Sequence, residues 1–251
     1  MSEDSARRST PAGDGTLVTP SRLRAAVARQ MAASKREIPH FYVSTEIAMD
    51  GALAELRELT SGSGPGARIT VSALLIHRLA RTLREHRAFN ALATKDGFVI
   101  VDSVNVGVAI ALEDGLIAPA LLDADRMDVR ELAGALEDLV ARSRAGRLRT
   151  AELTGATFTL SNLGMFGVIA FAAIVPPPQV GILAVGRSIP RPVVEDGAVV
   201  VRQVMTATLA ADHRTVDGAQ AARFLETFRG LIEGTLAAGW ADLRSMPQQR
   251  Q

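Results

Sequence analysis

A long uncharged stretch constrains the fold of this chain more than any other feature. From Gly155 to Gly186 the sequence contains no charged residue. That length would be enough to cross a bilayer, because a membrane-spanning helix needs about 20 apolar residues. However, three consecutive prolines, Pro176–Pro178, lie inside it, and proline removes a backbone donor and clashes with the preceding helical turn. We therefore predict two buried strands joined by a loop, and no membrane span.

The rest of the chain mixes helical and strand patterns without an internal repeat. Apolar residues recur at helical spacing in five segments, which predicts helices over residues 21–37, 50–60, 71–85, 129–144 and 219–236. Runs rich in β-branched residues predict strands at PHFYVSTEIAM, FVIV, VNVGVAIA, LIAPALL, TFTLS, VGILAVG and AVVVRQVMTATLAA. Because helices and strands do not alternate regularly, we predict an α+β fold, with helices on one side of a largely antiparallel or mixed sheet.

Charge and cysteine content narrow the function classes. The chain has 28 basic and 27 acidic side chains and a net charge of +1, which disfavours nucleic acid and anionic membranes as partners. It has no cysteine, which excludes disulfides, thiolate metal ligands and a cysteine nucleophile and fits a cytoplasmic location. The first 20 residues are rich in Ser, Pro, Gly and charge, as flexible linkers are. We expect a folded domain over residues 21–245 and a short tail over 246–251.

The stretch ADHRTVDGAQAARFL places His213 and Asp217 four residues apart, between a predicted strand and a predicted helix. Asp217 or Thr215 could be the N-cap of that helix, with His213 an ordinary turn residue. Alternatively, an exposed imidazole with a pKa near about 6.5 could accept a proton at neutral pH. A metal site is disfavoured because the other histidines show no metal-motif spacing: His40, His77 and His86. The pattern alone leaves the first two interpretations open.

Five stretches, in the same order, resemble dihydrolipoamide acyltransferases, the catalytic cores of 2-oxoacid dehydrogenase complexes. ADHRTVDGAQAARFL resembles the DHRxxDG signature of that family. The other four stretches are RLRAAVARQMAASKREIPHFYVSTEI, VNVGVAIALEDGLIAPALL, FTLSNLGMFGV and IVPPPQVGILAVG. The resemblance covers roughly residues 21–232. It implies a chloramphenicol acetyltransferase-like fold, with a mixed sheet covered by helices, that forms trimers.

The resemblance implies direct transfer of an acyl group between the thiols of dihydrolipoamide and coenzyme A. A free thiol has a pKa near about 8.5, so a base must generate the thiolate at neutral pH, and His213 occupies the position of the family's base. Ser161 occupies the position of the hydroxyl that stabilises the oxyanion, although its local pattern alone favours a strand-end cap. Asp217 is expected to organise the site. Supporting roles are expected for Asp212, Arg214, Asn162 and Gly218, the last through close packing or an unusual backbone angle.

The same resemblance implies substrates and partners. Coenzyme A and lipoamide are expected to meet in a channel between subunits of a homotrimer, with His213 from one subunit and Ser161 from its neighbour. No metal is expected, and the residues that bind coenzyme A stay unassigned. The stretches SNLGMFGV and AAIVPPPQVGILAVG favour acetyl as the acyl group. Two alternatives stay open: a non-catalytic scaffold, and a coenzyme-A-dependent acetyltransferase for a small hydroxyl or amine.

The segments outside the predicted domain bear on assembly. Neither a lipoyl domain nor a peripheral subunit-binding domain fits into the first 20 residues. The chain is therefore expected to be either a core fragment or a natural single-domain version. In the second case we expect a lipoyl domain in trans, together with the other 2-oxoacid dehydrogenase components. The sequence ends in GWADLRSMPQQRQ, whereas relatives that build cages end in a leucine-rich anchor. We expect a free trimer, with a 24-chain cube as the second possibility.

Overall fold

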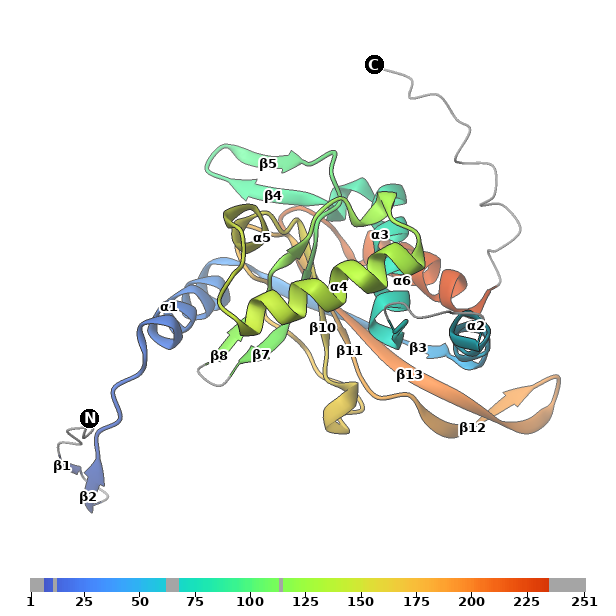
Figure 1. Ribbon diagram of the computed structural model, residues 1–251, viewed down its shortest axis with the longest axis horizontal. Coiled ribbons are helices and arrows are strands. Elements are labelled where there is room, and N and C mark those ends of the chain that lie inside the picture. Colours follow the sequence, from blue (N-terminus) through green and yellow to red (C-terminus); the bar gives the residue numbers. More distant parts are fainter. Residues whose placement is uncertain (1–6, 11–12, 62–67, 113–114, 235–251) are drawn as a thin grey trace.

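A seven-stranded mixed sheet forms the centre of the molecule (Figure 1). The computed structural model describes residues 7–10, 13–61, 68–112 and 115–234. The strands run in the order β12-β13-β11-β10-β6-β9, and β3 also pairs with β13. β10 is parallel to β6 and β11, and the other pairs are antiparallel. The strand bounds are β3 His40–Ala48, β6 Val106–Val108, β9 Ala120–Leu121, β10 Phe158–Asn162, β11 Gly181–Val185, β12 Ile189–Glu195 and β13 Ala198–Asp212.

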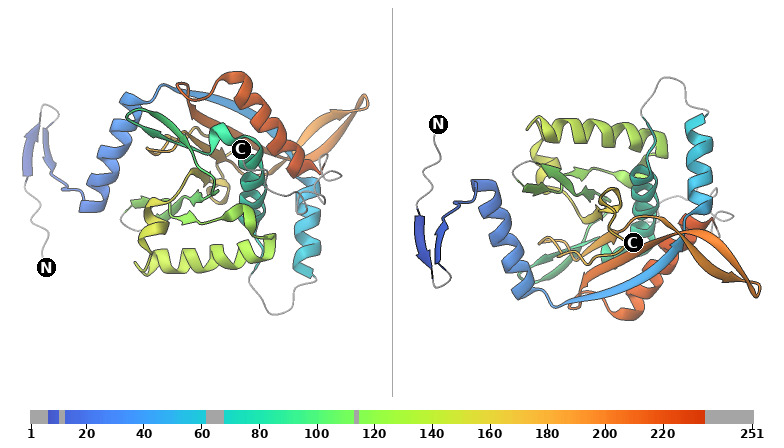
Figure 2. Two further views of the ribbon diagram at one scale, coloured as in Figure 1. Left: turned by 90° about the horizontal axis from the view of Figure 1, so that it is seen from above. Right: turned by 90° about the horizontal axis from the view of Figure 1, so that it is seen from below.

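Helices pack on this sheet, and three hairpins lie outside it. The helices are α1 Arg22–Glu37, α2 Asp50–Ser61, α3 Val71–Glu85, α4 Val129–Arg144, α5 Thr150–Thr154 and α6 Gly218–Glu233, with short 3-10 turns η1 Arg87–Phe89, η2 Ala124–Arg126 and η3 Gly164–Phe166. The hairpins pair β1 Arg7–Thr10 with β2 Gly13–Thr16, β4 Ala91–Thr94 with β5 Gly97–Ile100, and β7 Ile110–Leu112 with β8 Gly115–Ile117. α3 contacts both α4 and α6, and buried residues of all three join those of the sheet in one core. α1 projects away from these helices (Figure 2).

The predicted helices agree closely with the structure. The helices predicted over 21–37, 50–60, 71–85 and 129–144 are confirmed to within one residue at each end. The last helix, α6, ends at Glu233, because Gly234 takes a left-handed backbone angle, φ 80°, that terminates a helix. The predicted extension to residue 236 lies outside the described residues.

The uncharged stretch folds as two strands joined by a loop, as its prolines predict. β10 and β11 are neighbours in the middle of the sheet and run parallel. All five residues of β11 are buried, which explains the absence of charge. In the described part of the chain, no helix is both long and apolar enough to cross a membrane. The cytoplasmic location stays a prediction.

The N-terminal segment contains structure that its composition did not predict. Residues 1–20 are expected to be a flexible linker, yet β1 and β2 form an antiparallel hairpin there. Every residue of β2 is exposed, so this strand adds nothing to the core. The domain boundary near residue 20 stays a prediction.

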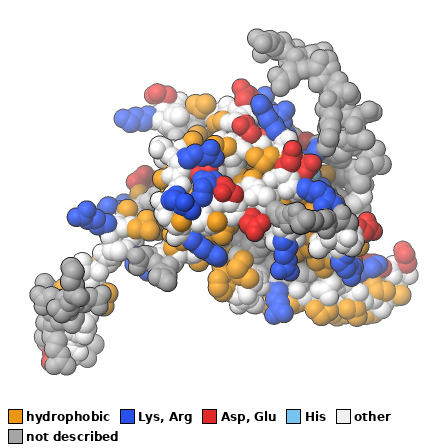
Figure 3. All heavy atoms as spheres, viewed as in Figure 1, with side chains coloured by type: hydrophobic (Ala, Val, Ile, Leu, Met, Phe, Trp, Pro, Cys, Tyr) orange, Lys and Arg blue, Asp and Glu red, His pale blue; other side chains and the backbone are white. Residues whose placement is uncertain are grey.

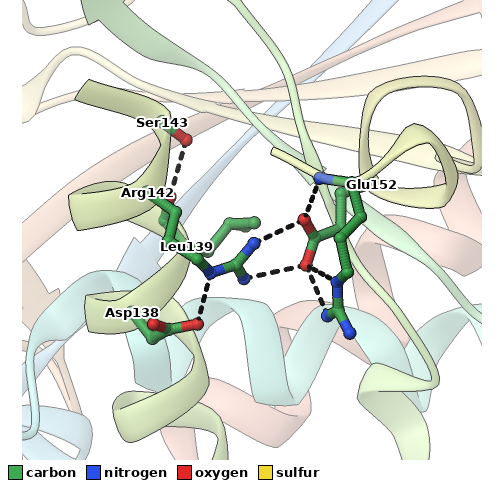
Figure 4. Close-up of polar contacts among 6 residues, drawn as sticks. Asp138, Leu139, Arg142, Ser143 and Glu152 are labelled. Atoms are coloured by element: carbon green, nitrogen blue, oxygen red, sulfur yellow. Dashed lines mark hydrogen bonds and ion pairs between the residues drawn. The ribbon is translucent and has the colours of Figure 1, made fainter. Parts of the chain in front are cut away.

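A buried carboxylate joins α4 to α5, just ahead of β10 (Figure 4). The Glu152 side chain is 2% exposed and accepts hydrogen bonds from Arg142 at 2.6 and 2.8 Å and from Arg149 at 2.5 and 2.9 Å. These two guanidinium groups, Arg142 foremost, hold the pKa of Glu152 well below its usual range. Arg142 also forms an ion pair with Asp138 at 2.7 Å, and the Asp138 side chain is mostly exposed. Glu152 is therefore an ionised anchor for the segment that leads into β10.

Glu152→Gln should lower the free energy of unfolding by about 3 kcal/mol at neutral pH, the lower end of the range for breaking a buried ion pair. Asp138→Asn is the matched control: it removes an exposed partner of the same arginine and should cost less than about 1 kcal/mol. Urea denaturation at a fixed protein concentration measures both. Because folding lowers the pKa of Glu152, its contribution is present above the ordinary glutamate pKa of about 4.3 and is lost as the pH falls further. The difference between wild type and Glu152→Gln should therefore shrink below about pH 4; equal losses for both variants, or a difference that grows in acid, would contradict this role.

Candidate functional site

His213 lies in a tight turn immediately after β13. Its backbone N–H donates to the carbonyl of Pro39 at 3.1 Å, and its imidazole lies 4.7 Å from the ring of Phe41, centroid to centroid, at a 56° tilt. The residue is exposed. The turn is thus fixed by its backbone while the imidazole stays accessible to a substrate.

Asp212, the residue before His213, anchors the same turn through its hydrogen bonds. Asp212 is fully buried and accepts hydrogen bonds from the backbone N–H of Arg214 at 3.0 Å and from the Arg214 guanidinium at 2.6 and 2.9 Å. This hydrogen bonding raises the pKa of Arg214, which keeps its guanidinium charged. The backbone N–H of Asp212 donates to the carbonyl of Val180 at 2.9 Å. Asp212 and Arg214 hold the turn together, and their supporting role in the site stays a prediction.

Asp217 caps α6. Its carboxylate accepts the N–H of Gln220 at 2.8 Å, and the Gln220 side chain accepts the N–H of Asp217 at 2.9 Å, which completes a capping box. Within one chain the contacts of Asp217 are therefore those of an N-cap, which fixes where the helix begins relative to His213. Gly218 shows neither expected property: a Cβ there would meet nothing within 4 Å, and its φ lies outside the left-handed region.

Ser161 and Asn162 end β10. Ser161 is partly buried and lies beside Ala184 of β11. The Asn162 amide donates to the hydroxyl of Ser72 at 3.1 Å, and its carbonyl oxygen accepts the N–H of Gly164 at 2.8 Å. Asn162 thereby connects the end of β10 to α3 and to η3. The supporting role of Asn162 in the site stays a prediction.

A close backbone contact just after β11 escaped prediction. Gly186 follows β11, and a Cβ at this position would lie 1.9 Å from the carbonyl oxygen of Ile169. Only glycine fits there, because nothing in that backbone contact can move aside. The sequence signal was the glycine that ends VGILAVG, but its neighbour is 17 residues away in the chain.

Within one chain, Ser161 and His213 lie at opposite ends of the strands that carry them, β10 and β13, which are separated by β11. In the register of the sheet, Ser161 pairs with Ala184 of β11, and Ala184 pairs with Thr208 of β13. His213 lies five residues further along the chain. Five residues at about 3.3 Å each and two strand spacings at about 4.8 Å each place the Cα atoms of Ser161 and His213 about 19 Å apart. One carbonyl cannot contact both side chains of the same chain, because reacting groups must lie about 3 Å apart.

The remaining histidines belong to other surroundings. His77 is buried on α3. His86 hydrogen-bonds Thr227 at 2.9 Å, and burial, with a smaller effect of Arg223, lowers its pKa. It faces a cavity of about 660 Å³ between α3 and α6 that contains none of the predicted site residues. Among the described residues, no group of three or more His, Asp or Glu side chains is placed to hold a metal ion.

Comparisons with known proteins identify the family. The profile described as 2-oxoacid dehydrogenases acyltransferase (catalytic domain) matches residues 13–238. The acetyltransferase component of the Zymomonas mobilis pyruvate dehydrogenase complex is 36% identical over 237 residues, which cover 91% of this chain and 54% of the relative. The chloroplastic component 4 of Arabidopsis thaliana is 40% identical over 223 residues, covering 88% of this chain and 45% of the relative. The chain thus spans about half the length of the curated relatives it matches.

Solved structures agree. A probable dihydrolipoamide acetyltransferase from Listeria monocytogenes superimposes with a TM-score of 0.85 at 30% identity, covering 91% of this chain and 98% of that one. The cubic core of a pyruvate dehydrogenase complex gives 0.84 at 29%, covering 90% and 94%. A chloramphenicol acetyltransferase, at 0.53 and 15% identity over 83% and 94%, shares the fold, which confirms the expected architecture. The chain belongs to the 2-oxoacid dehydrogenase acyltransferase family, which it matches through the catalytic domain.

Proposed function

We propose that the chain transfers an acetyl group between dihydrolipoamide and coenzyme A as the core of a pyruvate-type 2-oxoacid dehydrogenase complex. The observation that carries this proposal is the exposed His213 imidazole on a rigidly held turn. The relatives from Zymomonas mobilis and Arabidopsis thaliana are both named as dihydrolipoyllysine-residue acetyltransferases of pyruvate dehydrogenase complexes, which supports acetyl.

The proposed reaction needs one general base for the attacking thiol and one hydrogen-bond donor for the oxyanion. The His213 imidazole accepts the proton of the attacking thiol, which alone would be mostly protonated at neutral pH. The resulting thiolate adds to the thioester carbonyl and forms a tetrahedral intermediate with a negatively charged oxygen. The Ser161 hydroxyl donates a hydrogen bond to that oxygen. When the intermediate collapses, the bond between the carbonyl carbon and the sulfur that originally carried the acyl group breaks. The thiolate that leaves takes the proton from His213.

The estimated distance between Ser161 and His213 within one chain supports a site built from two chains. We propose a homotrimer in which His213 of one subunit faces Ser161 of its neighbour. A heterologous contact of this kind closes into a ring when the rotation permits. Exposed apolar side chains at the Ser161 end of the sheet support a subunit interface there, on the η3 loop and on the ribbon of β12 and β13 (Figure 3): Met165, Phe166, Ile169, Val194, Val199 and Val201.

A related structure supports the choice of residues. The Azotobacter vinelandii dihydrolipoamide acetyltransferase, 28% identical with a TM-score of 0.84 over 90% of this chain and 94% of that one, was solved to study a serine, a histidine and an asparagine in its catalytic mechanism. In that protein the serine precedes the histidine by 52 residues and the asparagine follows it by four. The same spacings separate Ser161, His213 and Asp217. We propose that Asp217 takes the place of the asparagine, where its capping role sets the geometry.

The remaining substrates and partners are part of the proposal. Coenzyme A and a lipoyl group carried on another domain or chain are the substrates, and the dehydrogenase components are the partners. The cubic core among the similar structures makes a 24-chain assembly the alternative to a free trimer. A native mass near three times 26.6 kDa supports the trimer, whereas a mass near 24 chains contradicts it.

Acyl transfer to free dihydrolipoamide tests the function. Purified chain is supplied with acetyl, succinyl or isobutyryl coenzyme A, and the acyl-dihydrolipoamide formed is measured. We expect the highest kcat/KM with acetyl. Faster transfer of another acyl group would overturn the choice of acetyl, and no transfer by an intact trimer would favour a scaffold.

A further inference from the structure

His40 connects two segments that hold the turn of His213. It is the first residue of β3, and its ring is partly buried. Its Nδ1 lies 2.8 Å from the carbonyl oxygen of Ile38, and its Nε2 lies 3.0 Å from the backbone nitrogen of Val175. Val175 belongs to the proline loop that joins β10 to β11 and is fully buried. The imidazole is therefore a bridge between β3 and a loop 135 residues away.

These two partners define the state of the ring. A backbone N–H only donates, so Nε2 of His40 must accept and carries no proton. A carbonyl oxygen only accepts, so Nδ1 must carry the proton. His40 is thus a neutral imidazole with the proton on Nδ1, and both of its nitrogens are used. This state leaves His40 no free nitrogen for a substrate.

Both segments that His40 joins contact the turn of His213 directly. On the β3 side, the neighbours of His40 do so: Pro39 accepts the His213 N–H, and the Phe41 ring lies against the imidazole. On the loop side, the carbonyl of Val180 accepts the N–H of Asp212 at 2.9 Å. The His40–Val175 hydrogen bond is a side-chain link between these two supports of the turn.

The loop has further anchors besides His40. The Ser34 hydroxyl, buried on α1, donates to the carbonyl of Val175 at 2.6 Å, and the Gln30 amide donates to the carbonyl of Pro177 at 3.1 Å. β3 itself is paired with β13 along its whole length, from His40 to Ala48. Loss of the His40 bond should therefore leave the fold in place while loosening the relation between the loop and β3.

We propose that His40 is a positioning residue for the His213 base, acting as a neutral imidazole that fixes β3 to the proline loop. The proposal rests on the proposed function of His213. His40 touches neither substrate nor reacting atoms; it sets where Pro39, Phe41 and Val180 hold the turn. Displacements of about 1 Å in a site can cost up to about 100-fold in rate, so this link is worth a measurable part of kcat.

Two near-isosteric variants distinguish the contributions of the two ring nitrogens of His40. His40→Gln can place an amide oxygen where Nε2 lies and keep the bond from Val175. His40→Asn can place an amide nitrogen where Nδ1 lies, and keeps only the bond to Ile38. We expect His40→Asn to lose about 10-fold to 100-fold in kcat with KM within about 3-fold of wild type. We expect His40→Gln to recover kcat to within about 3-fold of wild type.

A spectroscopic measurement makes the test independent of turnover. The chain has four histidines, so ¹⁵N-histidine labelling yields four imidazole rings, each with separate Nδ1 and Nε2 signals. Wild type should show His40 protonated on Nδ1 only, and the His213 signals should shift in His40→Asn but not in His40→Gln. A His40 protonated on Nε2, unchanged His213 signals in His40→Asn, or equal kcat for the two variants would overturn the proposal. If wild type itself transfers no acyl group, the proposed function fails, while the His213 signals still decide the role of His40.

Discussion

His213→Ala should lower kcat for acetyl transfer to dihydrolipoamide by about 100-fold to 10,000-fold, the range for loss of a general base. Without the imidazole, only the small thiolate fraction present at neutral pH can attack. Since the side chain is exposed and its N–H bond to Pro39 comes from the backbone, the fold should survive. KM for acetyl coenzyme A should change much less than kcat, because the base acts in the transition state.

His86→Gln is the matched control for this variant. It removes an imidazole that hydrogen-bonds Thr227 on the far part of α6 and replaces it with another hydrogen-bonding side chain. Its kcat should stay within about 3-fold of wild type, well short of the loss of a base. His213→Ala that keeps full activity as an intact trimer would exclude His213 as the base. Raising the assay pH should partly restore His213→Ala, since more thiol then ionises without help.

Ser161→Ala should lower kcat by about 100-fold to 1,000-fold, equivalent to about 2.7 to 4 kcal/mol for one oxyanion donor. The loss should fall mainly on kcat, because the negative charge develops only in the transition state. Ser161→Thr keeps the hydroxyl and suits a strand, so it should retain much more activity than Ser161→Ala. Both variants preserve the backbone pairing of β10 with β11.

The comparison between Ser161→Ala and Ser161→Thr decides whether the hydroxyl is used. Steady-state kinetics at saturating dihydrolipoamide, with circular dichroism to verify folding, give the two values of kcat. Equal losses in both variants would indicate that shape at this position matters and the hydroxyl does not. Full activity in Ser161→Ala would remove Ser161 from the proposed mechanism.

Local patterns predicted most of the helices, because their signals lie within each segment. α3 and α4 have apolar faces of regular spacing, and Asp128 before α4 forms a capping box with Glu131. β12 was missed because Pro190 and Pro192 argue against a strand in a sequence pattern. The structure places β12 at the end of the strand order, where a missing backbone donor is tolerated. α5, with five residues, is too short to show a helical period.

Some features of the candidate site could likewise be predicted from local sequence patterns, and others could not. The turn around His213 could be predicted because a strand, a turn and a helix follow one another in the sequence. The role of His40 could not be predicted, because its ring accepts a hydrogen bond from Val175, which lies 135 residues away in the chain. For Asp217, the capping contact and the motif both predict importance, and the structure shows the cap. The distance between Ser161 and His213 depends on strand order and register, which no local pattern contains.

Mixed trimers test the central claim, that His213 and Ser161 of different chains form one site. Ser161→Ala and His213→Ala chains are co-expressed with different tags, and trimers that carry both tags are isolated. In each such trimer, one of the three sites combines an intact His213 with an intact Ser161 from the neighbour, so about one third of wild-type activity should return. If both residues served the same chain, no site in a mixed trimer would be intact. Mixed trimers no more active than the two parent variants would contradict the account.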